Sequence, residues 1–211
     1  MRNIVHNFQV SLEKSHELIE EADWMSFYKL LWPNALLINR INSDCEMQRK
    51  GIDVAVWLAS GKQIYIDEKR RDTWYGDILL ETISVGERQP NGDVVQRKRG
   101  WAIDGTKHCD FIAYAIPSVS KCFMLPFQLL RRTVIHNAST WKNNAKQKGQ
   151  GIKYPIDAPN EGYWTRSIAV TWDVLSEAMK EQMSRRFGSE IPLPPISRSN
   201  DMQLEFDWCK S

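Results

Sequence analysis

The fold of this chain is organised around the stretch QRKGIDVAVWLASGKQIYIDEKRR, residues 48–71. Its two runs at 52–59 and 63–71 are rich in β-branched and aromatic residues, which favours β-strands. The short turn Ser60-Gly61-Lys62 lies between them. Two strands separated by so short a turn pair as an antiparallel hairpin. The stretch therefore predicts a β-hairpin at the centre of the fold.

Three charged side chains of this hairpin are expected to converge. Side chains alternate between the two faces of a strand, so Asp67 and Lys69 share one face, and Asp53 at the start of the first strand lies near them. Clustered buried charges are costly unless the acids are neutralised, which a divalent cation bound through oxygen achieves. Mg²⁺ accepts carboxylates together with phosphate oxygens and waters, which suits phosphodiester hydrolysis. The pattern predicts Asp53 and Asp67 as ligands of Mg²⁺ or Mn²⁺, with Lys69 beside the attacking water.

The segments around the hairpin carry both helical and strand patterns. Apolar residues recur at helical intervals over 11–31 and again over 172–187. Together with the strands, these helices predict an α/β fold with a mixed central β-sheet flanked by helices. We expect a single domain over 1–187 and a Pro-containing C-terminal tail at 188–211. Further strands are expected at 77–85, 110–116, 121–125 and 163–172, a further helix at 126–137, and a surface loop at 138–152.

An acid, a hairpin and then D-x-K at a strand end form an order that resembles the PD-(D/E)XK nuclease superfamily, over about 11–136. The resemblance implies a restriction-endonuclease-like core, in which a helix is followed by a mixed sheet with flanking helices. It also implies metal-dependent cleavage of DNA or RNA, with Asp53 and Asp67 as metal ligands and Lys69 as the catalytic lysine. This chain departs from the usual pattern in carrying an extra acid, Glu68, between the second acid and the lysine.

Further acidic and amide side chains are candidates for the same site. In the resembling enzymes a glutamate of the first helix often joins the site, and of Glu17, Glu20 and Glu21 we favour Glu17. Gln48 is expected in the loop entering the first hairpin strand, where it would position a water or phosphate, or would only cap the turn. Glu81 lies within an apolar run, and since a buried acid without a partner is disfavoured, we expect it to be functional or paired.

Basic and aromatic side chains near the hairpin and after it are candidates for contacts to nucleic acid. Two arginines directly follow the D-x-K motif and are placed to grip phosphates. A second basic cluster precedes a tryptophan that can stack on a base or sugar, although such clusters also occur on ordinary solvated faces. The residues expected to bind nucleic acid are Arg70, Arg71, Arg97, Lys98, Arg99 and Trp101.

Composition narrows the class of protein further. The 211 residues carry 28 Lys and Arg against 26 Asp and Glu, a net charge of +2, which excludes binding of nucleic acid by bulk charge alone. The hydrophobic content of 42% suits a packed core. The N-terminus has no apolar stretch of a secretory signal, and no run approaches the roughly 18 apolar residues of a membrane span. These features predict a cytoplasmic protein that does not associate with membranes.

The sequence therefore predicts a Mg²⁺-dependent phosphodiesterase acting on nucleic acid, with DNA favoured over RNA. The alternative is a non-catalytic nucleic-acid-binding protein with a nuclease-like fold. Asp53, Asp67 and Lys69 argue against this alternative, because carboxylates without a metal would repel phosphate. The sequence leaves open whether the protein is a monomer or a homodimer.

Overall fold

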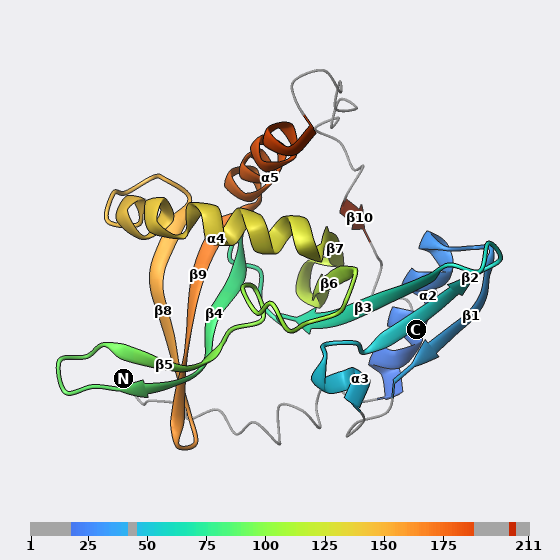
Figure 1. The fold of residues 1–211 in the computed structure, drawn as a ribbon, viewed down its shortest axis with the longest axis horizontal. Coiled ribbons are helices and arrows are strands. Elements are labelled where there is room, and N and C mark those ends of the chain that lie inside the picture. Colours follow the sequence, from blue (N-terminus) through green and yellow to red (C-terminus); the bar gives the residue numbers. More distant parts are fainter. Residues whose placement is uncertain (1–17, 42–45, 188–202, 206–211) are drawn as a thin grey trace. The chain divides into compact units, whose positions relative to one another are not determined.

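The computed structural model describes residues 18–41, 46–187 and 203–205 (Figure 1). These residues form a mixed α/β structure with four α-helices, a short 3₁₀-helix and ten strands. The α/β class predicted from the sequence is confirmed. The elements are α2 (Leu18–Leu31), β1 (Ala35–Arg40), α3 (Glu46–Arg49), β2 (Val54–Leu58), β3 (Gln63–Arg70), β4 (Asp77–Arg88), β5 (Val94–Arg99), β6 (Phe111–Ile116), η1 (Pro117–Val119), β7 (Lys121–Pro126), α4 (Phe127–Asn144), β8 (Ile152–Asn160), β9 (Tyr163–Thr171), α5 (Trp172–Phe187) and β10 (Gln203–Glu205).

The described residues divide into two compact units. The hairpin unit holds the described residues of 14–74, 106–128 and 193–211, and the second unit holds those of 75–105 and 129–192. Each unit has its own sheet, of six and of four strands, so the expectation of one central sheet is wrong. The assignment of 1–187 to a single nuclease-like domain, with a tail at 188–211, stays a prediction.

The hairpin unit contains a mixed sheet with the order β1-β2-β3-β6-β7-β10. All neighbouring strands are antiparallel except β3 and β6, which run parallel. Parallel neighbours need a long crossover connection, and here the chain passes through β4 and β5 of the second unit between them. The hairpin of β2 and β3 is confirmed, with Val54 opposite Ile66 and Val56 opposite Ile64.

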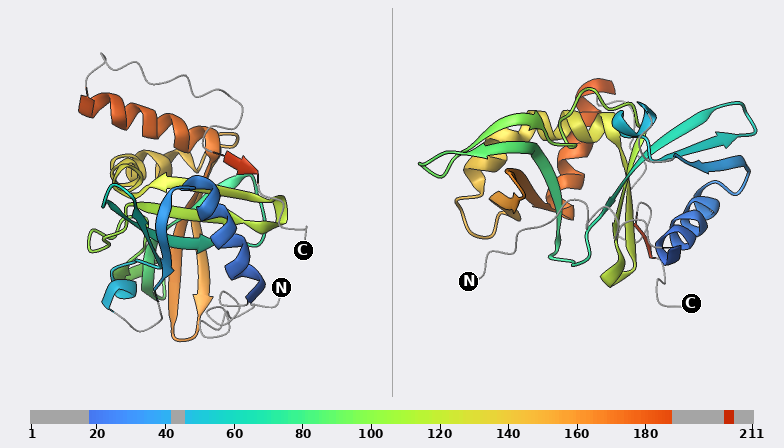
Figure 2. Two further views of the ribbon diagram at one scale, coloured as in Figure 1. Left: turned by 90° about the vertical axis from the view of Figure 1, so that its right-hand side faces the viewer. Right: turned by 90° about the horizontal axis from the view of Figure 1, so that it is seen from below.

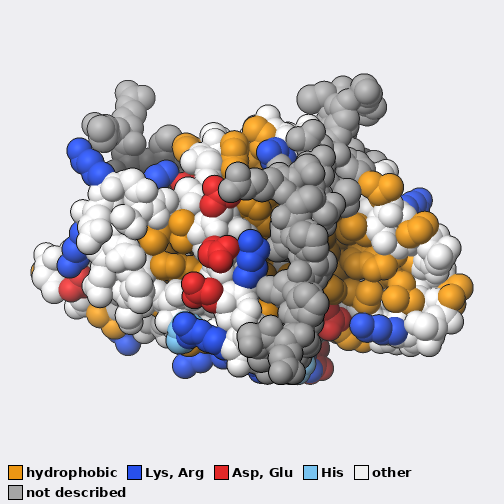
Figure 3. Space-filling model, turned by 90° about the horizontal axis from the view of Figure 1, so that it is seen from above, with side chains coloured by type: hydrophobic (Ala, Val, Ile, Leu, Met, Phe, Trp, Pro, Cys, Tyr) orange, Lys and Arg blue, Asp and Glu red, His pale blue; other side chains and the backbone are white. Residues whose placement is uncertain are grey.

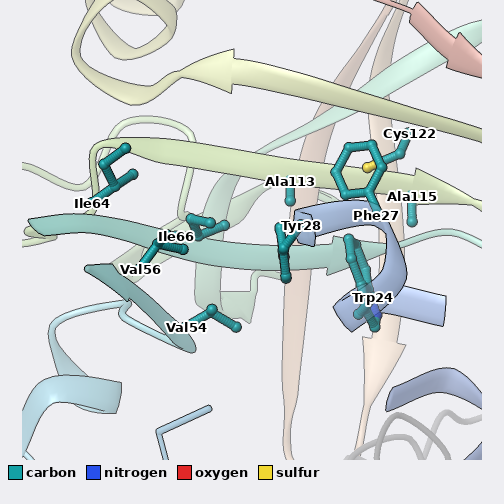
Figure 4. Packing of buried hydrophobic residues seen from close by; sticks show 10 residues of the cluster. All are labelled: Trp24, Phe27, Tyr28, Val54, Val56, Ile64, Ile66, Ala113, Ala115 and Cys122. Carbon is teal, nitrogen blue, oxygen red and sulfur yellow. The ribbon is translucent and has the colours of Figure 1, made fainter. Parts of the chain in front are cut away.

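Helix α2 packs on one face of this sheet. Trp24, Phe27 and Tyr28 recur at the spacing of one helix face and are buried (Figure 4). Their rings contact one another, with the Trp24 and Tyr28 centroids 5.8 Å apart. Because alternate residues of a strand share a face, the strand residues that meet α2 leave Asp53, Asp67 and Lys69 on the opposite face. The cluster also contains Val54, Val56, Ile64, Ile66, Ala113, Ala115 and Cys122.

The second unit contains an antiparallel sheet with the order β5-β4-β9-β8, in which β8 and β9 form a long hairpin (Figure 2). Strand β8 falls largely outside the sequence expectation because Pro155 and Pro159 interrupt the strand pattern. Its place at the sheet edge explains why the prolines are tolerated, since an edge strand needs fewer backbone donors. Helix α4 extends into residues 138–144, where a loop was expected and where Trp141 is buried. Helix α5 matches the predicted 172–187.

None of the helices in the described part of the chain is both long and apolar enough to cross a membrane.

Candidate functional site

Asp53 and Asp67 face each other across the hairpin. Val54 is the last residue of β2 that pairs with β3, opposite Ile66, and the Asp53 amide also donates to the Ile66 carbonyl at 2.8 Å. The side chain of Asp53 interacts electrostatically with that of Asp67, so the two carboxylates lie close together. The Asp53 carboxylate accepts a hydrogen bond of 2.7 Å from the amide of Glu68. The two carboxylates therefore meet on the sheet face opposite α2, as the alternation of side chains predicts.

Asp67 is held between two lysines. Its side chain is only 2% exposed. The Lys69 ammonium donates to Asp67 Oδ1 and also to the Glu68 carbonyl, at 2.9 Å for the latter. The Lys107 ammonium donates to Asp67 Oδ2 at 2.5 Å. Each carboxylate oxygen of Asp67 thus has an ammonium group of its own.

The two carboxylates differ in their electrostatic surroundings. Burial raises the pKa of Asp53, the negative charge of Asp67 raises it further, and Lys69 opposes the rise only in part. Burial also acts to raise the pKa of Asp67, but Lys69 and Lys107 together outweigh it, so the pKa of Asp67 is lowered. Asp67 is therefore the stably ionised member of the pair. Without a metal, the folded protein disfavours the ionised form of Asp53.

This disfavoured charge predicts the effect of Asp53→Asn. The substitution removes a buried charge that lies close to the charge of Asp67, so it should stabilise the metal-free protein at pH 7 by up to about 1 kcal/mol. Urea unfolding in EDTA measures the change. Asp72→Asn is the matched control, because Asp72 is exposed and pairs with a cation, Arg70, at 2.7 Å. A loss of stability in Asp53→Asn as large as that in Asp72→Asn, or larger, would contradict the expected repulsion.

Lys107 is a residue that the sequence analysis missed. It lies 40 positions from Asp67 in the chain, and no motif connects the two. The one local feature beside the Lys107 ammonium is Gly51, which follows α3 in the left-handed conformation with φ of 73°. The amides of Gly51 and Ile52 donate to the carbonyls of Gln48 and Met47, as in a Schellman motif.

Glu68, the extra acid of the motif, points to the other face of the sheet. Its carboxylate receives Arg40 Nη1 at 2.8 Å and Nη2 at 3.1 Å, and the Tyr28 hydroxyl donates to it at 2.8 Å. Burial raises the pKa of Glu68, with Arg40 opposing the rise. Glu68 therefore ties β3 to β1 and α2 and takes no part in the acid pair.

The remaining acidic and amide candidates have different outcomes. Gln48 is half-buried in the hairpin unit and lies in the short helix α3, so the expectation of a loop there is wrong. Glu81 is half-buried on β4 of the second unit, so the hairpin unit by itself does not contain it. Burial raises the pKa of Tyr163, and the charge of Glu81 contributes to this rise. Glu17 lies outside the described residues.

The predicted nucleic-acid contacts fall in both units. In the hairpin unit Arg70 pairs with Asp72, and the Arg71 amide donates to a carbonyl of β6. In the second unit the basic cluster is exposed on β5, an edge strand, where charged side chains also discourage pairing with other chains. Trp101 is half-buried after this strand. On the face drawn in Figure 3, Lys and Arg side chains lie in several small groups among other residue types. The basic cluster on β5 consists of Arg97, Lys98 and Arg99, and Arg97 pairs with Glu87.

The donor set at the acid pair suits a magnesium ion. Mg²⁺ is commonly bound through one or two carboxylates, with waters and substrate phosphate completing its six positions. Asp53 and Asp67 supply those two carboxylates side by side. Among the described residues, no three His, Cys, Asp or Glu side chains form a metal-binding group, so a more enclosed site such as that of structural zinc is not present there.

A pocket of about 330 Å³ lies in the second unit, and none of the predicted site residues lines it. It is lined by the segment that follows α4, by the first residues of β4 and β8 and by the last residue of β9. Lys153 in its wall pairs with the buried Asp77 at 2.7 Å. Its lining residues are Tyr75, Asp77, Ala145, Lys146, Gln147, Lys148, Gly149, Gly151, Ile152, Lys153 and Thr171.

Comparisons with models of protein families, with curated proteins and with solved structures found no match to this chain.

Proposed function

We propose that this protein is a metal-dependent nuclease that hydrolyses phosphodiester bonds of nucleic acid, with DNA as the favoured substrate. The observation that carries the proposal is the convergence of Asp53, Asp67 and Lys69 on one face of the hairpin. The order of helix α2, three antiparallel strands and then the parallel strand β6 supports the restriction-endonuclease-like core that the resemblance implies.

The residues divide the chemistry between them. Asp53 and Asp67 would hold Mg²⁺ or Mn²⁺, which when bound activates water and polarises a phosphoryl oxygen. Lys69 is positioned by two acceptors, Asp67 Oδ1 and the Glu68 carbonyl, so its ammonium has a defined direction. From there it can orient the attacking water and stabilise negative charge that develops on the phosphate oxygens.

Metal dependence is the direct test of this proposal. The wild-type protein is incubated with linear, nicked, branched and single-stranded DNA and with RNA, in Mg²⁺, in Mn²⁺ or in EDTA. We expect cleavage of at least one substrate with metal, none in EDTA, and recovery when excess metal is added back. Gel electrophoresis of end-labelled substrates measures the products. Cleavage that EDTA does not reduce would refute the metal-dependent mechanism.

A non-catalytic nucleic-acid-binding protein is the second candidate. The observation that favours it is the pairing of both Asp67 oxygens with lysine ammonium groups, which satisfies the carboxylate without a metal. This candidate predicts binding of nucleic acid without cleavage under every metal condition. Electrophoretic mobility shifts run on the same substrate panel distinguish the two functions.

A further inference from the structure

The Lys107 ammonium lies beside the acid pair of Asp53 and Asp67, in a largely buried position. The Lys107 side chain is 15% exposed, and its Nζ lies 2.5 Å from Asp67 Oδ2. Backbone hydrogen bonds hold the residues that directly follow Lys107. The His108 amide donates to the Lys50 carbonyl at 2.8 Å, and the Asp110 amide donates to the Tyr65 carbonyl at 2.7 Å. Backbone contacts to the turn after α3 and to β3 therefore help to set the position of Lys107.

Gly51 leaves the room that this ammonium occupies. A Cβ atom on Gly51 would lie 2.5 Å from Lys107 Nζ and 3.2 Å from Asp67 Oδ2. Both distances are shorter than ordinary van der Waals contact, so a larger residue at this position would displace the lysine from the carboxylate. The turn after α3 thus keeps space for a cation against Asp67.

The charges of the four groups sum to zero. With all of them ionised, Asp53 and Asp67 contribute two negative charges, and Lys69 and Lys107 contribute two positive charges. A divalent cation that binds the acid pair meets both ammonium groups at the same carboxylate, and like charges at such distances repel. Binding of the cation is therefore coupled to movement of at least one lysine.

The hydrogen bonds indicate which lysine moves. Lys69 has a second acceptor, the Glu68 carbonyl, which holds it in place without Asp67. Within the described part of the chain, Lys107 has Asp67 Oδ2 as its hydrogen-bond acceptor and no other. When Lys107 leaves Asp67, it gives up this one hydrogen bond. The backbone contacts of its segment remain, and the long lysine side chain can extend into solvent.

We propose that Lys107 is a built-in competitor of the divalent cation: it occupies Asp67 Oδ2 in the metal-free protein and must be displaced for the metal to bind. This inference rests on the proposed function and concerns the regulation of the same site. Lys107 lowers the metal affinity and so sets the metal concentration at which the site becomes loaded.

Metal affinity of a charge-removing variant tests this inference. Isothermal titration calorimetry with Mn²⁺ alone compares wild type with Lys107→Met, which keeps the alkyl chain and removes the charge. Lys62→Met is the matched control, because Lys62 is exposed in the hairpin turn. Losing a charge-assisted competitor should lower the Mn²⁺ Kd of Lys107→Met about tenfold or more and leave that of Lys62→Met unchanged. Asp67→Asn in the Lys107→Met background should abolish the binding.

The possible results separate this inference from the proposed function. An Mn²⁺ Kd in Lys107→Met that equals or exceeds that of wild type overturns the competitor role and leaves the metal site standing. Absence of Mn²⁺ binding in both proteins overturns the metal site and the competitor role together. Binding in the variant alone supports both. If Lys107→Met does not fold by circular dichroism, Lys107→Gln replaces it with the same expected direction, since it also lacks the charge.

Discussion

Lys69→Met should lower the cleavage rate constant about 10³-fold at saturating Mn²⁺, because the chain then loses both the group that orients the attacking water and a cation next to the phosphate. The loss should be in kcat, since Lys69 acts on charge that develops in the transition state. Single-turnover kinetics on the best substrate of the panel measures it. Mn²⁺ binding should remain, because Asp53 and Asp67 are unchanged.

The control for this experiment is Lys62→Met, which removes a lysine from the turn of the same hairpin and should cleave as wild type does. Circular dichroism and the Mn²⁺ titration test whether the Lys69 variant is folded and able to bind metal. Equal activity in Lys69→Met and wild type would remove the lysine from the mechanism. A folded variant that has lost Mn²⁺ binding would assign Lys69 to the structure of the acid pair.

Glu68→Ala should destabilise the protein by about 3 kcal/mol, because it leaves the Arg40 guanidinium without its carboxylate in a largely buried setting. The Glu68 and Arg40 side chains are 12% and 23% exposed. The substitution also removes the acceptor of the Tyr28 hydroxyl on α2. Denaturant unfolding followed by circular dichroism measures the change in free energy.

Asp72→Ala is the matched control for Glu68→Ala. It breaks the ion pair with Arg70, but the Asp72 side chain is 79% exposed, so we expect a loss of no more than about 1 kcal/mol. The double variant Arg40→Met with Glu68→Ala should recover part of the loss, since the buried charge that has lost the Glu68 carboxylate is then absent. A loss in Glu68→Ala no larger than in Asp72→Ala would show that the buried pair does not hold β3 to β1 and α2.

The positions of Asp53, Asp67 and Lys69 could be predicted from the sequence because they depend on short-range rules. A short turn sets the pairing of the two strands, and alternation assigns each side chain to a face. The same rules place Glu68 on the opposite face, but its partners on α2 and β1 come from packing between elements. Its role as a structural ion pair could not be predicted from the motif.

Segments whose structure depends on distant neighbours were harder to predict. Strand β8 contains two prolines, and only its place at a sheet edge makes them acceptable. Strand β5 is largely exposed and basic, so it lacks the apolar alternation that identifies a strand. Residues 138–144 continue α4 because Trp141 is buried, and this burial depends on tertiary packing.

The amino-acid sequence alone determined the hairpin, the α/β class and the meeting of two acids with one lysine, because turn length and side-chain alternation act within a few residues. The tertiary structure decided that Lys107 completes the charge balance of this site. It did so by bringing a segment 40 residues from Asp67 against the hairpin, where Gly51 leaves space for the ammonium group. Long-range placement of this kind arises from backbone pairing between distant segments, which local patterns do not encode.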